Sequence, residues 1–155
     1  MKLALLKRQL LNKGALWLSY IKLIPILKKI NKDSIVLDCG ANTGDISIKF
    51  AKRGATVYAF EPDPLAYNLL ITKVKKYPNV NCIQKGVWDK NEQVALYTHK
   101  DQEADDAAFT VGSSIKSDKV NVDKAKAQYI EVIDLSAFIK QLGKKIDVIK
   151  LDVEG

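Results

Sequence analysis

The sequence is poor in the residues that build metal sites and disulfide frameworks. It has two cysteines, Cys39 and Cys82, and one histidine, His99. A disulfide scaffold needs more cysteines, and a structural zinc site needs paired cysteine or histidine spacing. Both cysteines lie in apolar, strand-like runs, which favours two buried thiols in a reducing compartment. These shortages exclude small disulfide-rich scaffolds and zinc-binding modules.

Long apolar runs are missing as well. The longest uncharged stretch near the N-terminus covers residues 14–21, which is too short to span a bilayer. Lys22 interrupts it, and no small-residue cleavage site follows. The chain also lacks repeats and low-complexity tracts, and its 47% hydrophobic and 28% charged residues are ordinary for a globular domain. We therefore predict a cytoplasmic, globular protein without a signal peptide or a transmembrane segment.

The positive charge is confined to one end of the chain. Residues 1–33 hold eight basic residues and one acid, which accounts for the whole net charge of +7, and residues 34–155 sum to zero. We therefore expect no nucleic-acid partner and predict a basic amphipathic helical leader over residues 1–33. It either packs on the following domain or makes a peripheral contact with an anionic membrane through residues 1–30. Its apolar residues recur at near-helical spacing: Leu3, Leu6, Leu10, Trp17, Ile21, Ile24 and Leu27.

From residue 34 onward, strand-like and helix-like segments alternate. The run 35–39 is short, rich in β-branched residues and followed at once by Gly40, which is typical of a buried parallel strand. The alternation predicts an α/β, Rossmann-like fold with an open, mostly parallel sheet and flanking helices. The predicted strands cover 35–39, 55–60, 80–84 and 146–153, and the predicted helices cover 43–53, 65–76 and 135–142.

The stretch between the third strand and the last helix is less regular. Residues 94–98 and 107–115 are predicted as strands of an inserted hairpin, and 129–133 as a further short strand. The polar residues 116–128 are predicted as a loop.

A turn rich in small residues follows the first predicted strand. Its sequence is Asp38-Cys39-Gly40-Ala41-Asn42-Thr43-Gly44. Small residues let the backbone turn sharply and approach a ligand, and the next helix directs free N–H groups at that ligand. The spacing is not the G-x-G-x-x-G of a dinucleotide fingerprint, although a nicotinamide-dependent dehydrogenase remains an alternative. The predicted cofactor-binding residues of this turn are Asp38, Gly40, Ala41, Asn42 and Gly44.

Two further segments extend this cofactor constellation. Glu61, followed by Pro62, ends the second predicted strand, where a carboxylate can accept both hydroxyls of a ribose. Trp88 and Asp89 follow the third predicted strand, where they could flank an adenine. The alternative is that Trp88 belongs to the core and Asp89 to a turn.

Three motifs together resemble the FkbM-type methyltransferases. They are Val36 to Gly44, Ala59-Phe60-Glu61-Pro62-Asp63-Pro64, and Ile149-Lys150-Leu151-Asp152-Val153-Glu154-Gly155. The resemblance covers residues 34–155, interpreted as the N-terminal part of a class I methyltransferase domain. It implies seven strands in the order 3-2-1-4-5-7-6, of which the last strands are not in this sequence. It also implies S-adenosylmethionine (SAM) as the cofactor and O-methylation of a hydroxyl on a sugar, glycan or secondary metabolite.

The last motif supplies the candidate catalytic residues. Lys150, Asp152 and Glu154 alternate along a predicted strand and therefore share one face. A carboxylate such as Asp152 could take the proton of the acceptor hydroxyl. It could instead hold a divalent cation, which the motif does not itself indicate, so no residue is predicted as a metal ligand. In a third interpretation the trio orients the methionine end of the cofactor. A non-catalytic cofactor-binding fragment remains an alternative to an enzyme.

Overall fold

The main sheet has four parallel strands. The computed structural model describes residues 23–99 and 122–152. In that part of the chain, the strands β1 (Ile35–Cys39), β2 (Thr56–Phe60), β3 (Val80–Ile83) and β7 (Val148–Leu151) are ordered β3-β2-β1-β7. All five residues of β1 are buried, as its run of apolar residues predicts. The predicted α/β fold with a parallel sheet is confirmed.

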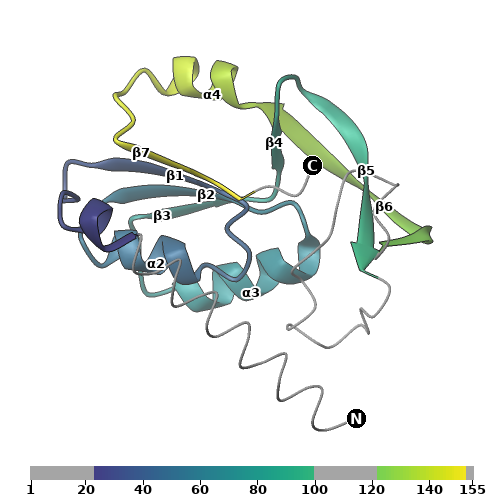
Figure 1. Cartoon of the computed structure of the whole chain (residues 1–155), viewed down its shortest axis with the longest axis horizontal. Coiled ribbons are helices and arrows are strands. Elements are labelled where there is room, and N and C mark those ends of the chain that lie inside the picture. The colour runs from purple at the N-terminus through teal and green to yellow at the C-terminus, as the bar shows by residue number, and fades with distance from the viewer. Residues whose placement is uncertain (1–22, 100–121, 153–155) are drawn as a thin grey trace, which may run out of the picture.

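Helices cover both faces of this sheet (Figure 1). The helices α2 (Asp45–Ala51) and α3 (Pro64–Val74) lie on one face, and α4 (Leu135–Leu142) lies on the other. Asp63 caps α3, because its side chain accepts hydrogen bonds from the backbone N–H groups of Leu65 and Ala66 at 2.8 and 3.0 Å. The predicted helix 135–142 matches α4, which ends at Gly143 in the left-handed conformation.

A second sheet of three strands stands beside the main sheet (Figure 1). It consists of β4 (Gly86–Trp88), β5 (Glu92–His99) and β6 (Val122–Asp134) in the order β4-β6-β5. The predicted loop over 116–128 is wrong for residues 122–128, which belong to β6. Antiparallel pairing with β5 overrides the polar composition of that stretch. The predicted strand 107–115 lies outside the described residues.

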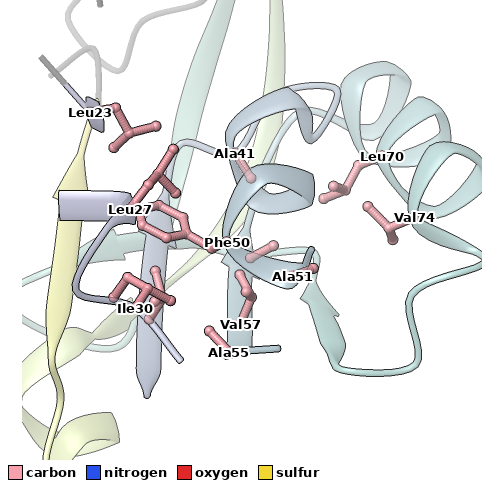
Figure 2. Close-up of a cluster of buried hydrophobic side chains, with 12 residues drawn as sticks. Leu23, Leu27, Ile30, Ala41, Phe50, Ala51, Ala55, Val57, Leu70 and Val74 are labelled. Atoms are coloured by element: carbon pink, nitrogen blue, oxygen red, sulfur yellow. The ribbon is translucent and has the colours of Figure 1, made fainter. Parts of the chain in front are cut away.

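Among the described residues, two hydrophobic clusters lie on the two faces of the main sheet, and a smaller one belongs to the second sheet. Figure 2 shows the larger one, in which Val57 of β2 and Phe50 of α2 pack with residues of α3. Leu23, Leu27 and Ile30 belong to the same cluster, so the end of the predicted leader packs into the core. The boundary at residue 33 and the membrane contact of residues 1–30 stay predictions. Within the described ranges, no helix is long and apolar enough to cross a membrane.

The second cluster lies between the main sheet and α4. Leu37 and Cys39 of β1 and Phe60 of β2 are buried there. The ring of Phe138 on α4 packs edge-to-face against Phe60, with ring centroids 5.1 Å apart. Alternate residues of β1 therefore serve different layers: Leu37 and Cys39 face α4, and Asp38 faces α2, whose Ser47 donates to its carboxylate.

A candidate cofactor site at the carboxyl edge of the main sheet

The turn after β1 is held by the end of β2. The backbone N–H groups of Gly40 and Ala41 both donate to the carbonyl oxygen of Phe60, at 3.0 and 2.9 Å. This places the turn from residue 40 to residue 44 next to Glu61, as the sequence predicts from the parallel order of the two strands.

The carboxylate of Glu61 joins this turn to the start of α3. Its Oε2 accepts a hydrogen bond from the backbone N–H of Asn42 at 2.7 Å, and its Oε1 accepts one from the backbone N–H of Asp63 at 2.9 Å. Glu61 is only 7% exposed. Burial raises its pKa from the ordinary 4.5 to about 7, and the two backbone hydrogen bonds offset this only in part. Since each carboxylate oxygen can accept a second hydrogen bond, both retain capacity for a ligand hydroxyl.

Three residues of the turn adopt the left-handed backbone conformation. The φ angles are 76° at Gly40, 50° at Asn42 and 86° at Gly44. Apart from glycine, asparagine is one of the few residues that adopt this conformation at low cost, which explains why position 42 can hold a residue with a side chain. A Cβ at Gly44 would lie 2.5 Å from Cδ1 of Leu70 on α3. Packing against α3 therefore explains this glycine, and its contact with a cofactor stays a prediction.

Asp38 is fully buried beneath the turn. Its Oδ2 accepts a hydrogen bond from the Ser47 hydroxyl at 2.6 Å, and its Oδ1 lies 3.2 Å from Nζ of Lys150 on β7. That ammonium also donates to the carbonyl oxygen of Gly40 at 2.7 Å and lies 3.5 Å from Oδ2 of Asp152. The side chain of Asp152 is 75% exposed. The structure thus brings two of the three candidate catalytic residues, Lys150 and Asp152, to the turn after β1, and Glu154 lies outside the described residues.

The remaining predicted residues lie at the junction with the second sheet. A Cβ at Gly86 would meet Pro62 at 3.7 Å, so β4 passes close to the loop that carries Glu61. Trp88 ends β4 and is 37% exposed, and Asp89 is exposed in the bend that follows. The alternative that Trp88 is a core residue is wrong, because Trp88 is exposed, and the bend at Asp89 agrees with the turn that the same alternative predicts. A role of both residues at an adenine stays a prediction.

The sequence analysis missed three side chains that shape the site. Asp63 caps α3 and donates its N–H to Glu61, and its place before Pro64 is a recognisable cap signal. Ser47 supports Asp38 from within an otherwise apolar helix face. Lys73 of α3 donates to the hydroxyl of Thr43 at 2.7 Å. Neither Ser47 nor Lys73 has a spacing signal that connects it to the turn.

In residues 23–99 and 122–152, no group of three or more histidine, cysteine or acidic side chains is arranged to hold a metal ion. Cys39 is buried, and burial raises its pKa to about 12, so its thiol is inert. A groove of about 540 Å³ lies elsewhere, between residues 25–34 and the start of β7, and contains none of the predicted site residues.

The sequence of the chain matches a known protein family. Residues 38–155 match the methyltransferase FkbM domain, which is more than half of the chain. The chain belongs to the FkbM methyltransferase family. The family is one of SAM-dependent methyltransferases, so SAM is the cofactor that this membership assigns. The match begins at Asp38 of β1 and includes the Lys150 motif.

Individual relatives resemble shorter parts of this chain. A Methanococcus maripaludis protein named probable cobalt-precorrin-6B C(15)-methyltransferase (decarboxylating) is 38% identical over 53 residues, which are 34% of this chain and 29% of that protein. The chain thus spans less than a third of that relative.

Two solved structures are similar over comparable shares of their length. The 23S rRNA methyltransferase ErmE is 25% identical with a TM-score of 0.37, over 41% of this chain and 27% of that chain. SMU.1697c of Streptococcus mutans, solved with S-adenosylhomocysteine (SAH), is 25% identical with a TM-score of 0.37, over 39% and 35%. With TM-scores below 0.5, neither structure adds to the assignment.

Proposed function

We propose that this FkbM domain binds SAM at the turn between β1 and α2 and supports methyl transfer to a hydroxyl oxygen. The observation that carries the proposal is the carboxylate of Glu61, buried at the end of β2 and fixed by the N–H groups of Asn42 and Asp63. A carboxylate held this way offers two oriented acceptors for the two hydroxyls of a ribose. Family membership supports the same cofactor.

The residues of the turn fit such a cofactor. Gly40 and Ala41 present little side chain, and Asn42 is held by Glu61, so the backbone of the turn would lie along the bound molecule. Pro62, Trp88 and Asp89 would border its adenine beyond β3. When bound, SAM would supply an electrophilic methyl group on its sulfonium.

Asp152 is the side chain best placed to act on the acceptor. It stands at the carboxyl end of β7 with its side chain 75% exposed, so an acceptor hydroxyl can reach it. Its carboxylate would take the hydroxyl proton while the hydroxyl oxygen forms its bond to the methyl carbon, and the bond between that carbon and the sulfonium sulfur would break and leave SAH. The resemblance to FkbM enzymes supports a sugar, glycan or secondary metabolite as the acceptor.

Calorimetric titration of the chain with SAH and with NAD tests the cofactor assignment. We expect SAH to bind and NAD not to bind. Binding of NAD without SAH would contradict the proposal and favour the dehydrogenase alternative, which neither the spacing of the turn nor the family supports.

The role of Asp152 is tested with labelled SAM and a panel of hydroxyl acceptors. Asp152→Asn should lower methyl transfer while the dissociation constant for SAH stays unchanged. Glu131→Gln is a matched control, because Glu131 is an exposed carboxylate on β6 of the second sheet, where it pairs with Lys85. Equal transfer rates for the wild type and Asp152→Asn would exclude Asp152 as the base.

A further inference from the structure

Lys150 reaches from β7 to the cofactor turn on the α2 side of the main sheet. Its position on β7 is opposite Asp38 on β1 in the sheet register. The side chain is 22% exposed, and its ammonium contacts three oxygens: the Gly40 carbonyl at 2.7 Å, Asp38 Oδ1 at 3.2 Å and Asp152 Oδ2 at 3.5 Å. Of these three contacts, only the one to the Gly40 carbonyl is a hydrogen bond, and the contacts with the two carboxylates are ion pairs.

The contact with Gly40 holds one peptide group from both ends. The carbonyl oxygen of Gly40 and the N–H of Ala41 belong to the same planar peptide unit. Lys150 donates to that oxygen from β7, and the N–H donates to the Phe60 carbonyl on β2 at 2.9 Å. The orientation of this peptide determines where the chain continues to Asn42, whose N–H bonds Glu61. A rotation at Gly40 would therefore displace the residue that orients Glu61.

The contact of Lys150 with Asp38 is an ion pair and not a hydrogen bond. Asp38 is fully buried, and its Oδ1 has no hydrogen bond, although the ammonium lies 3.2 Å away. Lys150 therefore supplies a compensating charge to Asp38, and it directs a short hydrogen bond at Gly40. Charge compensation and peptide orientation are two separable effects of the same side chain.

We propose that Lys150 is a positioning residue for the cofactor, which acts by fixing the peptide between Gly40 and Ala41, and is not itself a catalytic acid or base. The proposal rests on the proposed function, because it deepens the account of the SAM site. It assigns the proton transfer of the Lys-x-Asp motif to Asp152 alone and gives the lysine a role in cofactor affinity.

A pair of variants separates the two effects. Lys150→Met removes both the charge and the donor, and Asp38→Asn combined with Lys150→Met removes the need for the charge but still lacks the donor to Gly40. Lys145→Met is the control, since Lys145 lies just before β7 with its side chain 89% exposed. Each 155-residue variant is measured for its dissociation constant for SAH, for amide exchange at residues 40–44 without ligand, and for its melting temperature.

We expect Lys150→Met to raise the dissociation constant for SAH about tenfold or more, to speed amide exchange in the turn and to lower the melting temperature. The double variant should recover the melting temperature but keep the weak binding and the fast exchange. Lys145→Met should match the wild type in all three measurements.

Two results would overturn the inference. If the double variant recovers tight binding and slow exchange together with its melting temperature, Lys150 only compensates a buried charge. If Lys150→Met binds SAH as the wild type does, the lysine has no positioning role. A wild type that binds no SAH would instead refute the proposed function, and exchange at residues 40–44 would then still decide whether Lys150 fixes the turn.

Discussion

Cofactor binding should depend on pH through the single carboxylate of Glu61. Burial raises the pKa of Glu61 to about 7, and the ionised carboxylate is the form that accepts two ribose hydroxyls. The ionised fraction grows as the pH rises through the pKa, so the affinity for SAH should grow with pH over the same interval. A carboxylate with the ordinary pKa of 4.5 would be fully ionised throughout this range.

The size of the effect follows from the ionised fraction. With a pKa of about 7, the carboxylate is about one-tenth ionised at pH 6 and about nine-tenths ionised at pH 8. The dissociation constant for SAH should therefore be about tenfold higher at pH 6 than at pH 8. Glu61→Gln should bind weakly at both values, because losing charge-assisted contacts costs about 1.5–3 kcal/mol.

Calorimetric titration with SAH at pH 6, 7 and 8 measures this dependence. Glu61→Gln is the control, because its amide does not titrate, and its weaker dissociation constant should be the same at every pH. A flat dissociation constant in the wild type would refute the reasoning, as would a Glu61→Gln variant that keeps the wild-type slope.

The stability of the ligand-free protein should change with pH in the opposite direction. A carboxylate whose pKa is raised by folding adds stability that is complete below pH 4.5 and is lost as the pH rises through about 7. The shift corresponds to about 3 kcal/mol at roughly 1.4 kcal/mol for each pKa unit. Urea unfolding from pH 5 to pH 8 should therefore show falling stability, and this fall should be absent in Glu61→Gln. If the stability of the wild type rises from pH 5 to pH 8 relative to that of Glu61→Gln, folding lowers the pKa of Glu61, and the prediction is wrong.

Three further predictions concern the packing of the domain and the leader. Gly44→Ala should lower the free energy of unfolding in urea by about 1–3 kcal/mol, because its Cβ would lie 2.5 Å from Leu70. Gly143→Ala is the control: its φ is also positive, but its nearest contact is 4.0 Å away, so it should lower the free energy of unfolding by less. Phe138→Ala should lower the free energy of unfolding by roughly 2–4 kcal/mol, since the ring packs on Tyr58 and Phe60. An unchanged urea midpoint of unfolding would mean that α4 contributes little to the core. If residues 1–30 form a membrane-surface helix, anionic vesicles should sediment with the chain at low salt and release it at high salt, and neutral vesicles should not bind it.

The arrangement of the main sheet was predictable because its signals are local. The apolar run of β1 and the glycine after it fix where the first strand ends, and the Asp63-Pro64 pair marks the start of α3. Once the two strands are parallel neighbours, their carboxyl ends must share an edge. The meeting of the turn with Glu61 therefore follows from the sequence.

The second sheet and the inner face of the site depend on contacts between distant residues. The polar first half of β6 is held by pairing with β5, and the local sequence of residues 122–128 does not predict that pairing. Lys150 was predicted at the edge of the site from its motif. Its contact with the Gly40 carbonyl joins residues 110 positions apart and depends on the register of β1 and β7.

Two of the buried carboxylates at this edge, Asp38 and Glu61, have different roles because their partners differ. Asp38 receives the hydroxyl of Ser47 and the charge of Lys150, so its own chain already supplies both a donor and a counter-ion. In the described part of the chain, Glu61 accepts hydrogen bonds from two neutral backbone donors. Burial raises its pKa, and the charge of Lys150 is the smallest of the causes that lower it. An incoming pair of hydroxyl donors would stabilise the ionised form of Glu61, whereas the carboxylate of Asp38 is already occupied by Ser47 and Lys150. Of these two buried acids, Glu61 is therefore the one that should recognise the ligand, and Asp38 should support the turn from beneath.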